Sequence, residues 1–212
     1  MSSDQTSEAR LTRYPVWDRV SHWVVAMGFF LAGLSGLALF HPGPFWLTML
    51  FGGGPWTRIL HPFFGVVMAL VFASLAVRFW HHNLLEKHDW QWMKQIQDVL
   101  TNREDRLPEI GRYNAGQKLV FWLMVVCLGV LLITGIVFWR PWFALYFPIP
   151  LIRVAALLHA TAAAALIIGI LTHIYAAIWV KGTTGAMLEG TVSAKWARKH
   201  HALWYREMTK KA

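Results

Sequence analysis

The stretch LLHATAAAALIIGILTHIYAAIWVKG, residues 157–182, decides the fold. It is apolar and long enough to cross a lipid bilayer, whose hydrocarbon core takes about 20 residues of helix. Two histidines, His159 and His173, nevertheless lie within it. Ionisable side chains inside a membrane span usually face the interior of a helix bundle and take part in function. The stretch therefore predicts a membrane helix that carries two functional side chains.

The composition of the whole chain is that of a membrane protein. Of its 212 residues, 56% are hydrophobic, and the mean hydropathy is +0.41. The net charge of +9 does not indicate nucleic-acid binding, because the basic residues gather at the ends of apolar runs, as membrane topology requires. The single cysteine, Cys127, rules out an internal disulfide, a cysteine-ligated iron–sulfur cluster and a c-type haem.

Four apolar runs are long enough to span the bilayer. With no water in the hydrocarbon, each run is expected to be a helix. We therefore predict one domain over residues 1–212, an all-α membrane protein built as a four-helix transmembrane bundle. The predicted spans are about 20–40, 59–80, 117–139 and 151–180.

Two polar stretches, about 89–100 and about 190–208, have apolar residues near helical spacing. We predict that they are cytoplasmic amphipathic segments, and that the second lies as a helix on anionic lipid. The positive-inside rule gives the orientation, because one side of the bundle receives only Arg58, Arg140 and Arg153 while the other receives all the remaining basic residues near the spans. Both termini are therefore expected to be cytoplasmic. The polar first eighteen residues do not resemble a cleaved signal peptide.

Four of the ten histidines lie in or at the edge of a predicted span. Because successive helices alternate in direction, His61 and His159 share an outer layer, while His22 and His173 share an inner one. His159 and His173 are about 21 Å apart along their helix and face the same way within about 40°. Two layers with two histidines each provide the axial ligands that two bis-histidine b haems require. Gly65 and Gly169 would leave room for the flat macrocycles.

A role without haem is also open to these four histidines. They could brace the bundle through hydrogen bonds between helices, which would make the chain a haem-free membrane anchor. Zinc is disfavoured because neither layer has a cysteine or carboxylate to complete a tetrahedral site. The other six histidines are expected to face solvent or lipid headgroups: His41, His81, His82, His88, His200 and His201.

The stretch GRYNAGQK, residues 111–118, begins the third span. Asn114 stands where a helix N-cap is expected. It is also a candidate quinone ligand, because the amides of Asn114 and Gln117 can hydrogen-bond a carbonyl oxygen and Gly116 lets a ring approach the backbone. The sequence leaves both interpretations, helix cap and quinone pocket, open.

Several stretches together resemble a known family. The chain resembles the membrane cytochrome b (gamma) subunit of the respiratory formate dehydrogenases, which belongs to a group of dihaem cytochromes b that also serve nickel–iron hydrogenases. The similarity extends from about residue 13 to 207. It rests on RILHPFFG at 58–65, VRFWHHN at 77–83, RYNAGQK at 112–118, TGIVFWRPWF at 134–143, WVKG at 179–182 and WARKHHALWYRE at 196–207.

The resemblance implies an electron-transfer and quinone-reducing subunit of the bacterial inner membrane. Formate would be oxidised on a molybdenum- or tungsten-containing alpha subunit, and an iron–sulfur beta subunit would deliver electrons to the outer haem. The inner haem would reduce menaquinone or ubiquinone near the cytoplasm. The resemblance assigns the outer haem to His61 and His159 and the inner haem to His22 and His173, and it places quinone contacts near Asn114 and Gly116. A nickel–iron hydrogenase or another quinone-linked oxidoreductase is the alternative partner.

Overall fold

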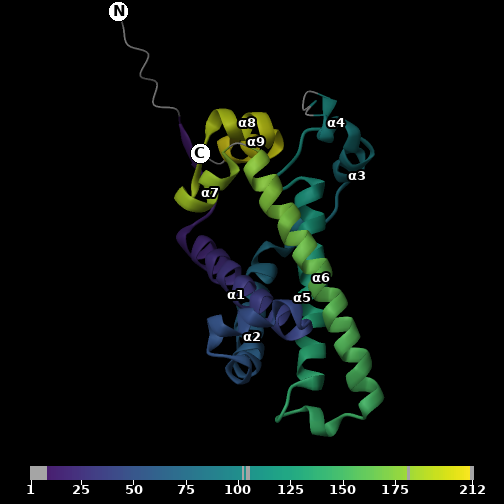
Figure 1. Ribbon diagram of the computed structural model, residues 1–212. Coiled ribbons are helices and arrows are strands. Elements are labelled where there is room, and N and C mark those ends of the chain that lie inside the picture. Colours follow the sequence, from purple (N-terminus) through teal and green to yellow (C-terminus); the bar gives the residue numbers. More distant parts are fainter. Residues whose placement is uncertain (1–8, 102, 104–105, 181, 211–212) are drawn as a thin grey trace, which may run out of the picture. The chain divides into compact units, whose positions relative to one another are not determined.

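The computed structural model describes residues 9–101, 103, 106–180 and 182–210. Part of the N-terminal segment, residues 1–8, and Lys181 in the WVKG stretch lie outside them. Within the described part, four helices are long and apolar enough to cross a membrane (Figure 1). They are α1 (Val16–Phe40), α2 (Gly54–Phe79), α5 (Ala115–Phe138) and α6 (Ile149–Trp179).

These helices lie where the four spans are predicted, and each ends within one residue of the predicted position. They begin two to five residues earlier than predicted, because hydropathy does not register a polar first turn. Asp18 lies in the first turn of α1, and Pro55 and Pro150 are the second residues of α2 and α6. Proline is tolerated there because the first N–H groups of a helix have no partner within it.

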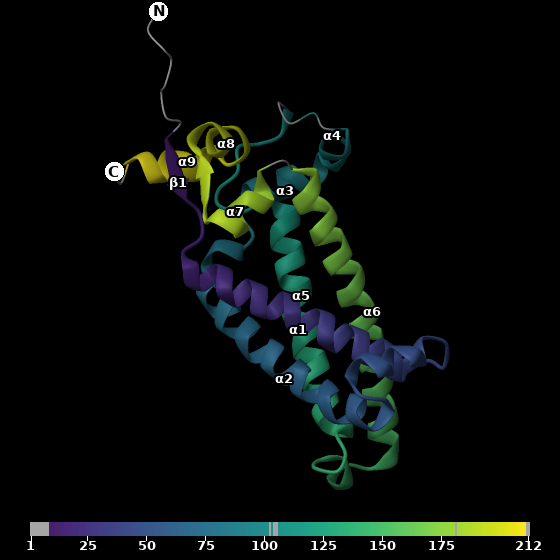
Figure 2. The same cartoon turned by 60° about the vertical axis from the view of Figure 1, so that its left-hand side comes forward.

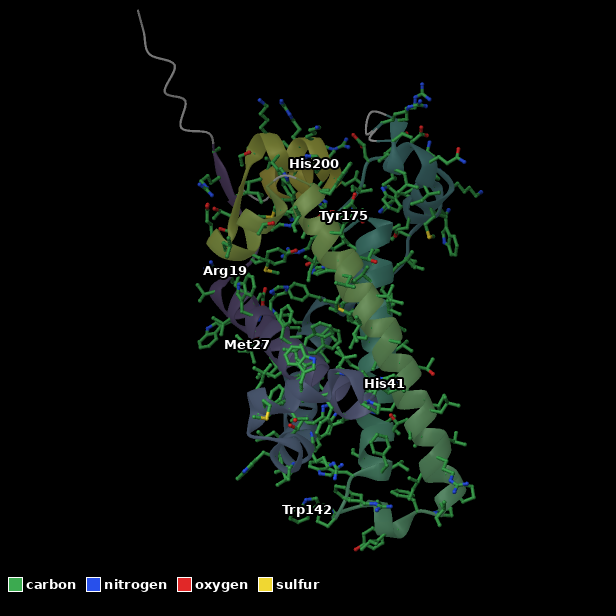
Figure 3. All side chains as sticks on the ribbon, viewed as in Figure 1. Arg19, Met27, His41, Trp142, Tyr175 and His200 are labelled. Atoms are coloured by element: carbon green, nitrogen blue, oxygen red, sulfur yellow. The ribbon has the colours of Figure 1, made fainter. Side chains whose placement is uncertain are left out.

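Most of the surface of the four helices is apolar and uncovered by protein. Only 17–22% of the residues in each apolar window are buried. Met27 on α1 and Trp142 after α5 project from the ribbon in Figure 3, and their exposed fractions are 61% and 62%. Apolar surface of this extent is characteristic of contact with lipid or partner proteins.

The described residues fall into two compact units. Unit 1 combines the N-terminal segment up to Arg19 with Phe79–Phe121 and with the chain from His173 onward. Unit 2 comprises Val20–Arg78 and Trp122–Thr172, so it contains the larger part of each long helix.

Unit 2 consists of two helical hairpins. In one, α1 and α2 lie side by side, joined by the 3-10 segment η1 (Gly43–Phe51), and in the other α5 and α6 lie side by side, with η4 (Ala144–Tyr146) between them (Figures 1 and 2). Glycine allows close approach in each hairpin. A Cβ at Gly28 would lie 2.9 Å from the Cβ of Met68, and a Cβ at Gly169 would lie 2.5 Å from Leu123. Small residues at such crossings are typical of membrane helix pairs.

Unit 1 contains a small folded core built from both ends of the chain. Strand β1 (Arg10–Thr12) pairs antiparallel with β2 (Thr191–Ser193). Helices α7 (Thr183–Glu189), α8 (Ala194–His200) and α9 (Ala202–Lys210) surround this pair (Figure 1). The buried core residues are Ala186, Val192, Ala197 and Trp204, and Leu11, Tyr14, Trp196, Tyr205 and Met208 pack on them.

This core corrects the expectation for the segment 190–208. It is not one helix, because it begins with a strand and its helical part breaks at His201. Trp204, on its apolar side, is only 2% exposed and packs within the protein. An amphipathic pattern predicts that one face is covered but does not identify the covering surface.

The segment 89–100 is also divided. It contains most of α3 (Lys87–Lys94) and all of α4 (Ile96–Leu100), which are separated at Gln95. The short η2 (Trp80–Asn83) connects α2 to this region. Trp92 on α3 is 7% exposed, so this segment too turns an apolar side chain into the protein.

Arg13 holds the N-terminal strand to the two later parts of unit 1. It is 2% exposed, and its guanidinium lies 4.3 Å from the ring centroid of Trp204, a cation–π distance. Its Nη2 donates to the carbonyl of Arg112, and Nη2 of Arg112 donates to the carbonyl of Arg13 at 2.7 Å. This reciprocal pair joins segments 99 residues apart in the chain.

A buried ion pair joins α3 to the first turn of α5. Nζ of Lys118 lies 2.7 Å from Oδ2 of Asp89, and the exposed fractions of the two side chains are 3% and 0%. The same Asp89 oxygen accepts from the backbone N–H of Glu86 at 2.7 Å and so caps α3. Nζ of Lys118 also donates to the Leu84 carbonyl.

We predict that Lys118→Met destabilises unit 1 by about 3–5 kcal/mol, because it leaves a buried carboxylate without its counter-ion. Thermal denaturation of the detergent-purified protein would measure this loss. The double variant with Asp89→Asn should recover much of the stability, since asparagine keeps a capping oxygen but carries no charge. Lys94→Met, at an exposed position on α3, is the matched control. Equal stability of Lys118→Met and Lys94→Met would contradict the prediction.

We also predict that acid destabilises the small core of unit 1 around Trp204, because His201 becomes protonated. Its Nδ1 donates to the Gly111 carbonyl at 2.8 Å, and burial lowers the pKa of this imidazole to about 3. Because the unfolded pKa is about 6.5, the stabilisation by neutral His201 is complete above pH 6.5 and is lost as pH falls toward 3. Each unit of pH below about 6 should lower the unfolding free energy of the core by up to about 1.4 kcal/mol.

Hydrogen exchange of the tail amides between pH 7.5 and pH 5, corrected for intrinsic rates, would measure this effect. The matched variant is His201→Asn, which keeps an amide donor near the Gly111 carbonyl but does not titrate. Its pH dependence should be flatter than that of the unmodified protein. Identical slopes for the two proteins would exclude His201 as the titrating group.

Candidate functional site

Unit 2 brings the rings of His61 and His159 close together. His61 lies in the second turn of α2, His159 lies in α6, and their ring centroids are 6.2 Å apart with an angle of 67° between the ring planes. Bonds from a transition metal to imidazole nitrogen are about 2.0–2.1 Å long, so two such bonds and two ring radii add up to roughly 6 Å between centroids. The spacing therefore fits one iron held between the two rings.

Each of these rings has a hydroxyl group at its Nδ1 atom. Oγ of Ser35 on α1 lies 2.9 Å from Nδ1 of His61, and Oγ1 of Thr134 on α5 lies 3.0 Å from Nδ1 of His159. With Nδ1 engaged on both rings, Nε2 is the nitrogen that each ring can offer to a metal.

Glycines follow both hydroxyl residues and admit the rings. A Cβ at Gly36 would lie 3.1 Å from Cε1 of His61, and a Cβ at Gly135 would lie 3.4 Å from Cε1 of His159. Gly65, one turn after His61, has open space where a side chain would start, as expected for a residue that leaves room for a macrocycle. Gly169 does not have that space, because Leu123 of α5 occupies it. The expectation for Gly169 was therefore wrong, and this glycine serves helix packing.

The ligand set favours a porphyrin over a bare metal ion. Across the residues that the structure describes, no group of three or more His, Cys, Asp or Glu side chains is placed to hold a metal ion. A tetrahedral zinc site needs three or four such ligands. A haem iron takes its four equatorial ligands from the macrocycle and needs only two axial ligands from the protein, which is what His61 and His159 offer.

The second predicted pair is divided between the units. His22 lies in the part of α1 that belongs to unit 2, with its ring edge-to-face against Trp23 at 5.3 Å. His173 lies in the part of α6 that belongs to unit 1. Their pairing stays a prediction that rests on helix direction and on the family resemblance.

The residues suggested for quinone binding form the N-terminal cap of α5. The backbone N–H of Gln117 donates to Oδ1 of Asn114 at 2.8 Å, and the backbone N–H of Asn114 donates to Oε1 of Gln117 at 2.9 Å. This reciprocal arrangement is a capping box and confirms the helix-cap interpretation of Asn114. Beside Gly116, a Cβ would lie 3.2 Å from the ring of Trp92, so a protein ring already approaches this glycine. Quinone binding by Asn114, Gly116 and Gln117 stays a prediction.

The six histidines expected at the surface do not all lie there. His41 is exposed, and its Nδ1 accepts from the N–H of Gly43 at 3.1 Å; it is labelled with His200 in Figure 3. His201 is only 3% exposed, which corrects the expectation for that residue. This burial could not be foreseen from the neighbouring residues, because the Gly111 carbonyl that accepts from His201 is 90 residues away.

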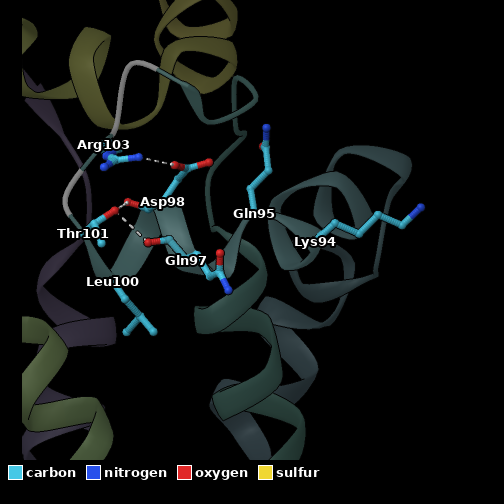
Figure 4. A pocket seen from close by; sticks show the side chains of 7 residues that line it. All are labelled: Lys94, Gln95, Gln97, Asp98, Leu100, Thr101 and Arg103. Atoms are coloured by element: carbon cyan, nitrogen blue, oxygen red, sulfur yellow. Dashed lines mark hydrogen bonds and ion pairs between the residues drawn. The ribbon is translucent and has the colours of Figure 1, made fainter.

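A surface hollow lies elsewhere, along α4 in unit 1. Figure 4 shows its lining, in which Thr101 hydrogen-bonds the preceding helical turn and Arg103 lies 3.9 Å from Asp98. None of the ten histidines lines this hollow. Its lining residues are mostly polar or charged: Lys94, Gln95, Gln97, Asp98, Leu100, Thr101 and Arg103. It does not contribute to the histidine site.

Sequence reasoning missed the two hydroxyl residues, although a sequence signal was present. Ser35-Gly36 and Thr134-Gly135 are the same kind of dipeptide, and they stand 26 and 25 residues before His61 and His159. Each hairpin of unit 2 thus carries a hydroxyl and a glycine on its first helix and a histidine on its second. A search for this spaced pattern would have found Ser35 and Thr134.

The chain is similar to known proteins over most of its length. The family model described as prokaryotic cytochrome b561 matches residues 13–190. The cytochrome b556(fdo) subunit of formate dehydrogenase from Escherichia coli strain K12 is 48% identical over 200 residues, 94% of each chain. The nitrate-inducible cytochrome b556(Fdn) subunit from the same strain is 48% identical over 193 residues, 91% of this chain and 89% of that one.

A third relative comes from another organism. The cytochrome b556 subunit of formate dehydrogenase from Haemophilus influenzae is 43% identical over 202 residues, which cover 95% of this chain and 85% of that protein. The family match spans the four long helices and includes both His61 and His159. This chain therefore belongs to the prokaryotic cytochrome b561 family, which implies a multi-pass membrane protein that carries haem b.

Proposed function

We propose that this chain is the dihaem cytochrome b subunit of a formate dehydrogenase complex. It would carry electrons from an iron–sulfur subunit on the outer face of the membrane to a quinone near the cytoplasmic face. The observation that carries the proposal is the 6.2 Å spacing of the His61 and His159 rings inside a membrane bundle. The choice of complex is supported by the relatives, which are named as formate dehydrogenase subunits.

In this proposal the residues of unit 2 hold the outer haem. His61 and His159 would each offer Nε2 to the haem iron. Phe138 lies edge-on to His159 at 5.0 Å, and Phe63 lies edge-on to Trp139 at 5.3 Å. The contact with Phe138 limits the rotation of the His159 ring. When bound, haem b supplies reversible one-electron chemistry within the membrane.

The inner haem is assigned to His22 and His173. Support comes from the alternation of helix direction, which gives these two residues the same depth in the bilayer, and from the family to which the chain belongs. Both residues lie near the membrane face at which the basic residues cluster. The positive-inside rule then makes that side cytoplasmic, with both termini there, and the membrane is the bacterial inner membrane.

The names of the relatives support a formate dehydrogenase complex as the partner. The family resemblance of the sequence further suggests an iron–sulfur beta subunit and a molybdenum- or tungsten-containing alpha subunit, on which formate itself would be oxidised. The domain over residues 1–212 would contribute electron transfer and quinone reduction, and lipid would cover its exposed apolar helices. The relatives' names favour formate dehydrogenase over a nickel–iron hydrogenase, and the family favours a haem protein over a haem-free anchor.

The quinone site is proposed at the start of α5, for menaquinone or ubiquinone. The capping bonds use the side-chain oxygens of Asn114 and Gln117. The amide nitrogens, whose hydrogens those bonds do not use, are the donors suited to a quinone carbonyl oxygen.

We predict that His61→Ala and His159→Ala each reduce the haem content from two per polypeptide to one. Removing either axial ligand leaves the outer iron without a six-coordinate site. A dithionite-reduced minus oxidised spectrum of the purified complex, with haem counted per chain, measures the change. His41→Ala, at an exposed histidine, is the matched control and should keep both haems. Two haems in the His159→Ala protein would show that the ligands are paired wrongly.

The identity of the electron donor can be tested in the same preparation. Formate added to the intact complex under anaerobic conditions should reduce the haems, and hydrogen gas should not. Reduction by hydrogen alone would instead assign the chain to a hydrogenase. A purified wild-type chain without haem, despite haem supply during expression, would exclude the cytochrome proposal altogether.

For the quinone site, we predict that Asn114→Asp lowers the catalytic efficiency with quinone by up to about tenfold, the equivalent of one hydrogen bond. Aspartate keeps the capping oxygen but has no amide donor, so stability and haem reduction by formate should be unchanged. Asn114→Ala, which also lacks the cap, should lose stability as well. Normal quinone reduction by a stable Asn114→Asp complex would restrict Asn114 to its role as a helix cap.

A further inference from the structure

The hydroxyls beside His61 and His159 are held in one orientation by their own helices. Oγ of Ser35 donates to the carbonyl of Leu31 at 2.6 Å. Oγ1 of Thr134 donates to the carbonyl of Val130 at 2.6 Å. A hydroxyl has one hydrogen to donate, so in both residues the oxygen faces the imidazole as an acceptor.

A second backbone carbonyl also lies near each hydroxyl and can only accept from it. Ala32 O is 3.2 Å from Oγ of Ser35, and Leu131 O is 3.4 Å from Oγ1 of Thr134. Since each hydroxyl hydrogen is directed to its own helix, the Nδ1 atom that faces the hydroxyl oxygen carries the hydrogen of that bond. Both imidazoles are therefore Nδ1–H tautomers with Nε2 free of hydrogen.

We propose that Ser35 and Thr134 are positioning residues of the outer haem, which fix both axial imidazoles and lower the reduction potential of the iron. The inference rests on the proposed function, because it requires that His61 and His159 are the axial ligands. A hydrogen bond from Nδ1–H to an acceptor increases the electron density at Nε2 and makes the imidazole a stronger ligand. A stronger donor favours ferric over ferrous iron, so the potential falls.

The same groups set the rotation of the rings. Each imidazole is attached at Nδ1 to the first helix of its own hairpin, and the glycine after the hydroxyl lies against Cε1. The two hairpins thus hold their rings with the planes 67° apart. The electron paramagnetic resonance signal of low-spin ferric haem depends on this angle, so it reports whether the hydroxyls set the rotation.

A serine or threonine in a helix commonly donates to the carbonyl four residues earlier, so this bond alone does not indicate a role at the haem. Thr161 and Thr172 on α6 make the same bond to the carbonyl four residues earlier, at 2.9 Å in each case. Ser35 and Thr134 differ in that each also has a histidine Nδ1 atom at hydrogen-bond distance. Thr161 is therefore a matched control for the loss of a helical hydroxyl in the same bundle.

The test is a redox titration of the intact complex that carries Ser35→Ala, Thr134→Val or both. Each single change should raise the reduction equilibrium constant of the outer haem by up to about tenfold, which is 59 mV for a one-electron couple. The double variant should show a larger shift than either single one and a changed resonance signal. Ser35→Thr and Thr134→Ser, which keep the hydroxyl, should restore the wild-type values. Thr161→Val should change neither reading.

An unchanged potential and signal in the double variant at full haem occupancy would overturn the inference. If the alanine or valine variants lose the outer haem, wild-type values in the hydroxyl-keeping variants would support the inference, and loss there too would contradict it. Failure of the proposed function is distinguishable, because the unmodified complex would then lack haem or His61→Ala would keep both haems.

Discussion

Placing imidazoles inside hydrocarbon is the constraint on which the rest of unit 2 depends. A ring nitrogen without a partner in the bilayer core is costly, and water is not available to satisfy it. In each hairpin the solution is a short chain of hydrogen bonds that starts at Nδ1 of the histidine, passes through a hydroxyl and ends on a backbone carbonyl of the neighbouring helix. Only Nε2 then remains for an iron. The hydroxyl satisfies one nitrogen of the imidazole, and the other nitrogen is left to bind the cofactor.

Unit 1 solves a different problem, which is to hold the ends of long apolar helices where the chain becomes polar. Some of its charged groups are buried in pairs or stacked on rings, as with Asp89 and Lys118 or with Arg13 on Trp204. Both arrangements bear on the start of α5. Lys118 lies in the first turn of that helix, and Arg112, which is linked to Arg13, lies three residues before it begins. The folded tail therefore stabilises the segment in which a quinone is proposed to bind.

The sequence was sufficient for those features that depend on the bilayer alone. Thickness and hydropathy predicted four helices, and these end within one residue of the predicted positions, at Phe40, Phe79, Phe138 and Trp179. Helix direction was enough to match His61 with His159. The features that the sequence did not predict depend on which helices contact each other. The contacts of Ser35 and Thr134 with the histidines of their hairpins are of this kind. The burial of His201 and Trp204 was missed because a helical pattern does not show that a distant strand will cover it.

The choice of hydroxyls beside His61 and His159 follows from the surrounding hydrocarbon. In many metal sites the distal nitrogen of a histidine ligand donates to a carboxylate, which makes the imidazole a strong donor. A carboxylate in the centre of a bilayer would bring a charge that costs about 2.5–3.5 kcal/mol even by the lower estimates. None of the four predicted spans contains Asp or Glu. A serine or threonine whose hydrogen is bound to its own helix gives an uncharged acceptor at little cost. The bundle can thereby orient a ligand and strengthen it as a donor without placing a negative charge in lipid.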